Sequence, residues 1–224
     1  MFSKATLNFL DDLAANNDRT WFAANKQHYE SLVREPALEF IAAMAPVLDR
    51  IAPHFRAEAR KVGGSLMRVF RDTRFSRDKT PYKTNIGIQF RHSLGKDVHA
   101  PGFYLHIGTD ECFFGAGCWH PDSDALAKIR DLIAAEPDRW FSARNDQRFA
   151  LNWELVGDQL LRPPRGYAVD HVAIDDLKRK DFIGFAPLSF AAATSSGLPK
   201  LAGERFAAAA PLMGFLCEAL GAPY

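Results

Sequence analysis

The stretch from Asn85 to Cys118 reads NIGIQFRHSLGKDVHAPGFYLHIGTDECFFGAGC. Apolar residues alternate with polar or small ones over residues 86–90 and again over residues 103–107. This two-residue period predicts strands with one buried face. Residues 109–111 have the composition of a tight turn, and they lead into a third strand, CFFGAG. We therefore expect this stretch to form consecutive antiparallel strands.

Before this stretch the sequence predicts mostly helix. Ser3 is suited to cap a first helix and Asp18 a second. Pro36 fits the first position of a third helix, and Pro46 should kink or divide that helix. Residues 67–71 are expected to add an earlier strand to the same sheet.

After the strands, apolar spacing indicates a helix over residues 123–135, a short aromatic helix over 137–144 and a C-terminal helix over 199–220. Residues 182–188 are predicted as a last strand, and Pro187 favours an edge position for it. The order of elements predicts an α+β fold, in which N-terminal and C-terminal helices pack on a mainly antiparallel central sheet. The polar residues 92–102 are expected to form a loop within that sheet.

Composition limits the class of protein. The chain has 224 residues, of which 47% are hydrophobic and 25% charged, as in soluble globular proteins. We expect one domain over residues 1–224. The three cysteines, the lack of a signal-like N-terminus and the lack of an apolar run of about 20 residues favour a cytoplasmic protein that does not enter membranes.

A basic segment precedes the strands: residues 68–84 read RVFRDTRFSRDKTPYKT. Between Arg56 and Lys83 there are nine basic and three acidic side chains, although the whole chain carries a net charge of only +1. Guanidinium groups bind carboxylate or phosphate through two hydrogen bonds. A local surplus of cations predicts a site for a small anionic or phosphate-bearing ligand, and it does not favour nucleic acid as the partner. The predicted ligand-binding residues are Arg68, Arg71, Arg74, Ser76, Lys79, Tyr82 and Lys83.

Three other interpretations of this segment stay open. In the first, Asp72 and Asp78 pair with the cations in an internal lattice without a ligand. In the second, the protein is a hydrolase or transferase for an anionic substrate, in which Lys79 or Tyr82 moves protons and Arg71 stabilises negative charge together with Arg74. In the third, the basic surface binds an acidic partner or nucleic acid. The sequence assigns no catalytic residue, cofactor or oligomeric state.

Two other patterns suggest sites but are weak. His106, Cys112, Cys118 and His120 are residue types that bind zinc, but no pair has the short Cys-x-x-Cys spacing, so we expect no metal site. The segment Gly115–Gly117 matches no long phosphate-binding glycine pattern. It favours a bulge or tight turn at the end of a strand.

The basic segment also resembles a known signature. From Arg68 to Thr84 the order Arg-x-x-Arg-Asp-x-Arg-Phe-Ser-x-Asp-Lys-x-Pro-Tyr-Lys-Thr resembles that of a bacterial conserved hypothetical family, domain of unknown function 2461. The resemblance implies a single α+β domain of about this length and no established activity. It extends to three further segments: Asn16-Asn17 … Trp21-Phe22, Gly115-x-Gly117-x-Trp119-x-Pro121, and Pro164-x-Gly166-Tyr167 … Asp170-His171.

Overall fold

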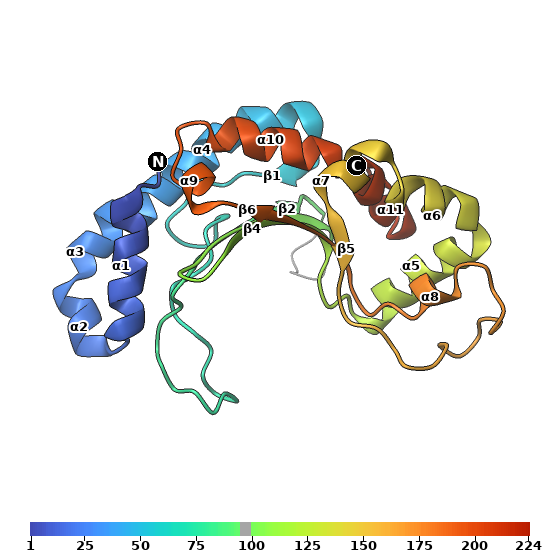
Figure 1. Ribbon diagram of the computed structural model, residues 1–224, viewed down its shortest axis with the longest axis horizontal. Coiled ribbons are helices and arrows are strands. Elements are labelled where there is room, and N and C mark those ends of the chain that lie inside the picture. Colours follow the sequence, from blue (N-terminus) through green and yellow to red (C-terminus); the bar gives the residue numbers. More distant parts are fainter. Residues whose placement is uncertain (95–99) are drawn as a thin grey trace.

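The computed structural model describes residues 1–94 and 100–224 (Figure 1). Residues 95–99, which belong to the loop predicted at 92–102, lie outside the described residues. The strands are β1 (Phe55–Arg56), β2 (Ile86–His92), β3 (Gly102–Ile107), β4 (Cys112–Cys118), β5 (Glu154–Val156) and β6 (Phe182–Leu188). Within the described residues they form one six-stranded sheet in the order β1-β2-β3-β4-β6-β5, and every neighbouring pair is antiparallel.

The helices precede, interrupt and follow this sheet. They are α1 (Lys4–Ala15), α2 (Arg19–Ala24), α3 (Lys26–Tyr29), the π-helical turn η1 (Glu30–Arg34), α4 (Glu35–Ile51), α5 (Ser123–Ala135), α6 (Pro137–Arg144), α7 (Gln147–Asn152), α8 (Ile174–Leu177), α9 (Phe190–Ala193), α10 (Leu198–Ala208) and α11 (Ala210–Ala219). The predicted α+β fold with a mainly antiparallel sheet is therefore confirmed. No helix in the described residues has the length and apolar character needed to cross a membrane.

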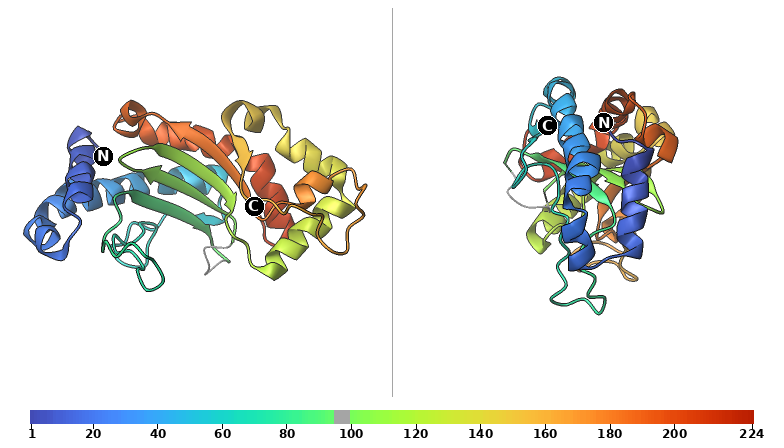
Figure 2. Two further views of the ribbon diagram at one scale, coloured as in Figure 1. Left: turned by 60° about the horizontal axis from the view of Figure 1, so that its bottom comes forward. Right: turned by 90° about the vertical axis from the view of Figure 1, so that its left-hand side faces the viewer.

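One face of the sheet packs on helices and the other does not. Phe206 of α10 lies against the rings of Phe90, Phe103 and Phe114, which come from three adjacent strands. Figures 1 and 2 show α4 and α10 over this face, and among the described residues no helix lies over the concave face opposite. Half-buried side chains therefore alternate with fully buried ones along β3. This is the physical origin of the two-residue period in the sequence.

The strands predicted from Asn85 to Cys118 are confirmed as β2, β3 and β4. The helices predicted at 123–135 and 137–144 are confirmed as α5 and α6. Asp122 caps α5 by accepting a hydrogen bond from the Ala125 amide at 2.8 Å. The C-terminal helix is present as α10 and α11, which meet at Ala209.

Some local predictions were wrong. Pro36 does lie in the first turn of α4, but no break precedes that helix, because η1 carries the chain from α3 directly into α4, and Pro46 lies inside α4 without dividing it. Gly115 and Gly117 form no bulge or turn at a strand end, because β4 pairs in unbroken register with β3 through Gly117 and with β6 through Cys118. Instead Gly117 adopts a φ of 130°, and a Cβ there would lie 2.0 Å from the Phe182 carbonyl oxygen.

The predicted edge position of β6 was also wrong. This strand lies between β4 and β5. However, β5 pairs only with Ile183, Gly184 and Phe185, so Pro187 has a strand partner on one side alone, at Phe113. Pro187 therefore lies at a locally open edge of the sheet, where proline is tolerated.

The basic segment does not add a strand to the sheet as predicted. Leu66 makes one bridge to Ile88, and the chain then leaves the sheet. It folds back on itself instead: the Arg71 amide donates to the Pro81 carbonyl at 2.9 Å and the Lys83 amide to the Val69 carbonyl at 2.7 Å. We name residues 69–83 the basic hairpin. In Figure 1 it projects below the concave face near the start of β2.

Candidate functional site

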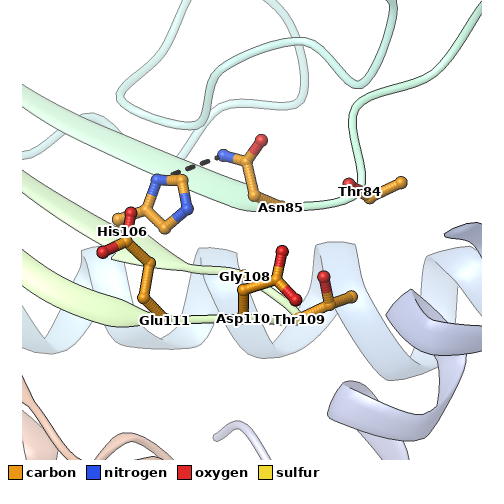
Figure 3. A pocket seen from close by; sticks show the side chains of 7 residues that line it. All are labelled: Thr84, Asn85, His106, Gly108, Thr109, Asp110 and Glu111. Atoms are coloured by element: carbon orange, nitrogen blue, oxygen red, sulfur yellow. Dashed lines mark hydrogen bonds between the residues drawn. The ribbon is translucent and has the colours of Figure 1, made fainter.

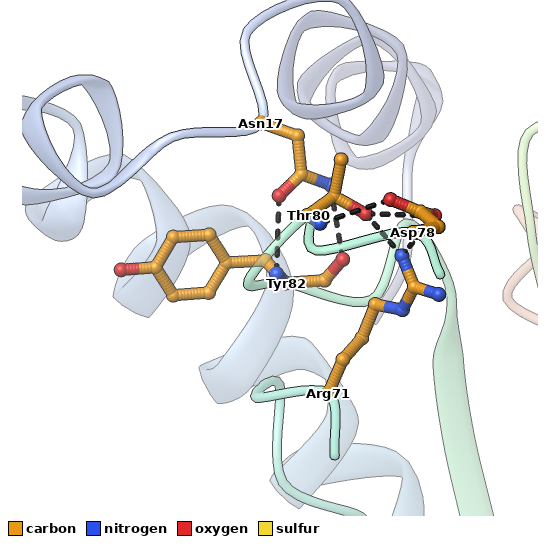
Figure 4. Close-up of polar contacts among 5 residues, drawn as sticks. All are labelled: Asn17, Arg71, Asp78, Thr80 and Tyr82. Carbon is orange, nitrogen blue, oxygen red and sulfur yellow. Dashed lines mark hydrogen bonds and ion pairs between the residues drawn. The ribbon is translucent and has the colours of Figure 1, made fainter. Parts of the chain in front are cut away.

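The basic hairpin is fastened to the N-terminal helices at Tyr82. The side chain of Asn17, between α1 and α2, donates through Nδ2 to the Tyr82 carbonyl at 2.9 Å and accepts from the Tyr82 amide at 3.0 Å (Figure 4). The Tyr82 ring stacks on Phe22 of α2 with centroids 4.0 Å apart, and the residue is only 5% exposed. These contacts hold the second arm of the hairpin in place and leave its tip in solvent.

Several cations of the basic hairpin are used within it. Arg74 binds Asp72 through Nε–Oδ1 at 3.0 Å and Nη2–Oδ2 at 2.7 Å. Arg71 pairs with Asp78 and also donates to the Thr80 hydroxyl. Each pair orders one side of the hairpin tip. For Arg71 and Arg74, the structure therefore agrees with the interpretation of an internal lattice of ion pairs.

The pKa values of the two hairpin carboxyls reflect these contacts. The side-chain hydrogen bonds from Arg74 lower the pKa of Asp72 to about 2. The backbone amide of Thr80, followed by the Arg71 guanidinium, lowers the pKa of Asp78 to about 2. Both carboxylates are therefore ionised at neutral pH and neutralise one arginine each.

Lys83 is in a different position from these paired cations. Its side chain is half-buried, and no carboxylate of the described residues forms an ion pair with it. Burial lowers the pKa of Lys83, and the positive charge of Arg68 nearby lowers it further. The charge of Arg68 thus acts on Lys83 and also on the Asp72 carboxylate, but no carboxylate of the described residues pairs with Lys83 itself.

Lys83 lines a cleft between the basic hairpin and the α1–α2 connection, with a volume of about 450 Å³. Figure 4 shows two sets of contacts among its lining residues: Arg71 with Asp78 and Thr80, and Asn17 with Tyr82. The lining is polar and of mixed charge. It consists of Ala14, Asn17, Arg71, Asp78, Thr80, Tyr82, Lys83, Thr84 and Asn85.

Three of the seven predicted ligand-binding residues line this cleft, and four do not. Arg71, Tyr82 and Lys83 line it, and the Tyr82 ring points away from Arg71 (Figure 4). The other four, Arg68, Arg74, Ser76 and Lys79, are not part of the lining, and the Lys79 ammonium instead donates to the Thr73 carbonyl at 2.8 Å.

The predicted ligand set missed the Asp78 carboxylate and four uncharged polar lining residues, Asn17, Thr80, Thr84 and Asn85. Asn17 lies far from the basic segment in sequence, so only the early Asn16-Asn17 pair in the family resemblance pointed to it. The other three adjoin predicted residues, but uncharged side chains give no charge pattern to recognise.

A second hollow, of about 320 Å³, adjoins the first, since Thr84 and Asn85 line both (Figure 3). Its remaining lining comes from the ends of β3 and from the turn into β4: His106, Gly108, Thr109, Asp110 and Glu111. In Figure 3 the His106 ring and the carboxylates of Asp110 and Glu111 extend to the same side of the ribbon. Thr84 and Asn85 form a common wall of the two hollows, which we name together the polar cleft, at one end of the open sheet face.

His106 is held in a defined orientation. Its Nδ1 atom lies 3.1 Å from the Tyr104 hydroxyl and 3.5 Å from Asn85 Nδ2. Its ring stacks on Phe113 of β4, with centroids 4.6 Å apart and planes 8° apart. Burial lowers the pKa of His106 below its ordinary value, with Glu111 acting in the opposite direction, so the ring is neutral at neutral pH.

The candidate zinc ligands do not lie together. Cys112 and Cys118 are buried on the helix-covered side of β4, whereas His106 extends from the opposite face of β3. His120 instead contacts the buried Asp181, with Nδ1 3.2 Å from Oδ1. The described residues contain no group of three or more His, Cys, Asp or Glu side chains arranged to hold a metal ion.

These features define an α+β protein whose open-faced antiparallel sheet ends in a polar cleft beside a basic hairpin. A family model described as "Conserved hypothetical protein (DUF2461)" matches residues 5–215, and the chain belongs to that family. Neither the curated proteins nor the solved structures contain a match to this chain.

Proposed function

We propose that this protein binds a small phosphate-bearing molecule in the cleft between the basic hairpin and the α1–α2 connection. The observation that carries the proposal is Lys83, a half-buried cation in the cleft lining that has no carboxylate partner among the described residues. A half-buried ammonium beside another cation costs free energy in the absence of a counter-ion. A bound dianion would remove that cost. The proposal assigns binding to this cleft and no reaction.

Lys83 would act as the main ligand for a phosphate oxygen, and Arg68, which lies outside the lining, would add to the positive potential there. Arg71 contributes a guanidinium that Asp78 and Thr80 already hold in place, so less side-chain entropy is lost when a ligand binds. The side-chain amides of Asn17 and Asn85 supply neutral donors at the edge of the cleft. Of the other predicted ligands, Arg74, Ser76 and Lys79 would act only through the overall positive field of the hairpin.

The structure and composition also bear on where the protein acts. All three cysteines, Cys112, Cys118 and Cys217, are free and buried. This is consistent with a reducing compartment, and we propose the cytoplasm.

Calorimetric titration with inorganic phosphate tests the proposed site. Charge-assisted hydrogen bonds contribute about 1.5–3 kcal/mol each, so Lys83→Ala should weaken binding by about tenfold or more. Arg74→Ala is the matched control, because it removes the same charge from a side chain that is 76% exposed, paired with Asp72 and outside the cleft. It should change the dissociation constant by less than about twofold, an effect of surface electrostatics alone.

Two results would contradict the proposal. One is the absence of saturable phosphate binding to the wild-type protein. The other is an equal loss of affinity in Lys83→Ala and Arg74→Ala, which would indicate attraction to the overall charge of the hairpin and no specific cleft site. Thermal melts of both variants should accompany the titration, so that a folding defect is not mistaken for lost affinity.

A further inference from the structure

The two halves of the polar cleft carry opposite charge. Arg71 and Lys83 contribute two cations to the half beside the basic hairpin and Asp78 one carboxylate, which leaves a net charge of +1 there. Asp110 and Glu111 contribute carboxylates to the half beside β3, and among the described residues no lysine or arginine lines that half. A ligand that fills both halves is therefore anionic at one end, and at the other end it carries hydrogen-bond donors that carboxylates can accept from.

The acidic half also has an aromatic wall. His106 lines it, and the His106 ring stacks on Phe113. The Phe113 ring centroid lies 5.0 Å from that of Phe185 on the next strand. The three rings belong to the concave sheet face that no described helix covers (Figure 2). Aromatic rings on an open sheet face are the surface on which planar nucleic-acid bases stack.

Glycine and tyrosine shape this wall. Gly87 lies opposite His106 in the sheet register, and a Cβ there would lie 2.8 Å from the Tyr104 hydroxyl. The Tyr104 side chain therefore reaches over Gly87 and places its hydroxyl beside His106 Nδ1. The contacts of Nδ1 with the Tyr104 hydroxyl and the Asn85 side-chain amide fix the orientation of the His106 ring. A fixed imidazole thus lines the hollow.

From this juxtaposition we infer that the ligand is a nucleotide, with its phosphate at Lys83 and an amino-bearing base beside His106 and the carboxylates of Asp110 and Glu111. The inference rests on the proposed phosphate site and adds the class of molecule that carries the phosphate. Asn85, which lines both halves, lies where the sugar would connect the two ends. An adenine amino group would donate to a carboxylate, whereas the carbonyl of hypoxanthine at the same ring position would not.

The test compares four molecules by calorimetry: inorganic phosphate, adenosine, adenosine monophosphate and inosine monophosphate. Adenosine monophosphate should bind at least about tenfold more tightly than inorganic phosphate, as expected for one stacked base. His106→Ala should remove this advantage and leave the affinity for inorganic phosphate unchanged. Glu111→Gln should weaken adenosine monophosphate more than inosine monophosphate. Glu154→Gln is the matched control: Glu154 is an exposed carboxylate at the far edge of the sheet, and its loss should change neither.

The outcomes separate this inference from the proposed function. If inorganic phosphate binds but adenosine monophosphate binds no more tightly, or if its advantage survives in His106→Ala, the nucleotide inference is wrong and the phosphate site stands. If adenosine alone binds as tightly as its monophosphate, the base is recognised without the Lys83 site and the joint assignment is overturned. If none of the four molecules binds, both the inference and the proposed function fail.

Discussion

Replacing Asn17 with alanine should destabilise the protein and release the basic hairpin. The Asn17 side chain makes two hydrogen bonds to the backbone of Tyr82, at 2.9 and 3.0 Å. A hydrogen bond of this kind contributes about 0.5–1.5 kcal/mol net, so the pair accounts for about 1–3 kcal/mol. We expect about 2 kcal/mol, because Tyr82 is 5% exposed and its amide would remain poorly hydrated after the substitution.

Urea denaturation of Asn17→Ala measures this loss, and the melting temperature should fall by about 4–8 °C for a chain of this size. Hydrogen exchange gives a local readout: the Lys83 amide, which donates to Val69 across the hairpin, should exchange faster in the variant.

Asn16→Ala is the matched control. Asn16 is the preceding residue and an exposed asparagine, and its side chain makes a single local bond to the Asp12 carbonyl at 2.9 Å. Its replacement should cost less than about 0.5 kcal/mol. Equal stability of the two variants, or unchanged exchange at Lys83 in Asn17→Ala, would refute the view that Asn17 holds the hairpin.

Three further predictions concern the sheet and the cleft. Lys83→Met should stabilise the protein by up to about 1 kcal/mol at neutral pH and low salt, since it removes a half-buried charge beside Arg68. Because folding lowers the pKa of Lys83, the wild-type protein bears this destabilisation fully at pH values below the folded-state pKa. The stability advantage of Lys83→Met should shrink as pH rises through the folded-state pKa, and it should vanish above the pKa of the unfolded chain. A constant difference in urea denaturation from neutral to alkaline pH would contradict this. Gly117→Ala should destabilise the protein by at least about 2 kcal/mol, because residue 117 has a φ of 130° and its Cβ would lie 2.0 Å from the Phe182 carbonyl oxygen. The control Gly115→Ala should cost under about 1 kcal/mol, since the nearest atom to its Cβ is Tyr104 Cβ at 3.4 Å. Equal melting temperatures of the two variants would show that the close approach at Gly117 is unimportant. Asp181→Ala should destabilise the protein by about 2–4 kcal/mol. The buried Asp181 carboxylate accepts hydrogen bonds from the His120 amide at 2.6 Å and the Asp158 amide at 3.2 Å, and both amides would lose their partner. A loss below about 1 kcal/mol in urea denaturation would mean that water replaces the carboxylate.

The fold was largely predictable because its central strands are buried on one side only. The alternation in residues 86–90 and 103–107 reflects an open face opposite a helix-covered one, so a short window of sequence contains the signal. The starts of α5 and α6 were also predictable from the sequence, since Asp122 and Pro137 are local signals for the beginning of a helix.

The failures have a common cause in long-range contacts. Residues 67–71 have strand-like composition, but Tyr82 packs on Phe22 and binds Asn17, and this draws the segment into the basic hairpin and away from the sheet. The π-helical turn η1, which joins α3 to α4 just before Pro36, also has no signal in the local sequence pattern.

The candidate site was predictable only in part. Charge density identified the basic segment, and three of its seven predicted residues, Arg71, Tyr82 and Lys83, line the cleft. Counting charges could not separate Arg74, which Asp72 neutralises, from Lys83, which has no carboxylate partner among the described residues. The acidic half of the cleft, at Asp110 and Glu111, was interpreted as a turn, because its closeness to Asn85 arises only from the pairing of β2 with β3.

The most direct test of the phosphate site is a ¹H–¹⁵N NMR titration of the wild-type protein with inorganic phosphate. If phosphate binds in the cleft, the shifts should saturate and centre on the backbone amides of Lys83, Thr84 and Asn85 and on the side-chain amide of Asn17. The amides of Arg74 and Lys79 should change little. Shifts that rise without saturation, or that centre on the exposed tip of the hairpin around Arg74, would contradict the claim that the cleft at Lys83 is a phosphate site.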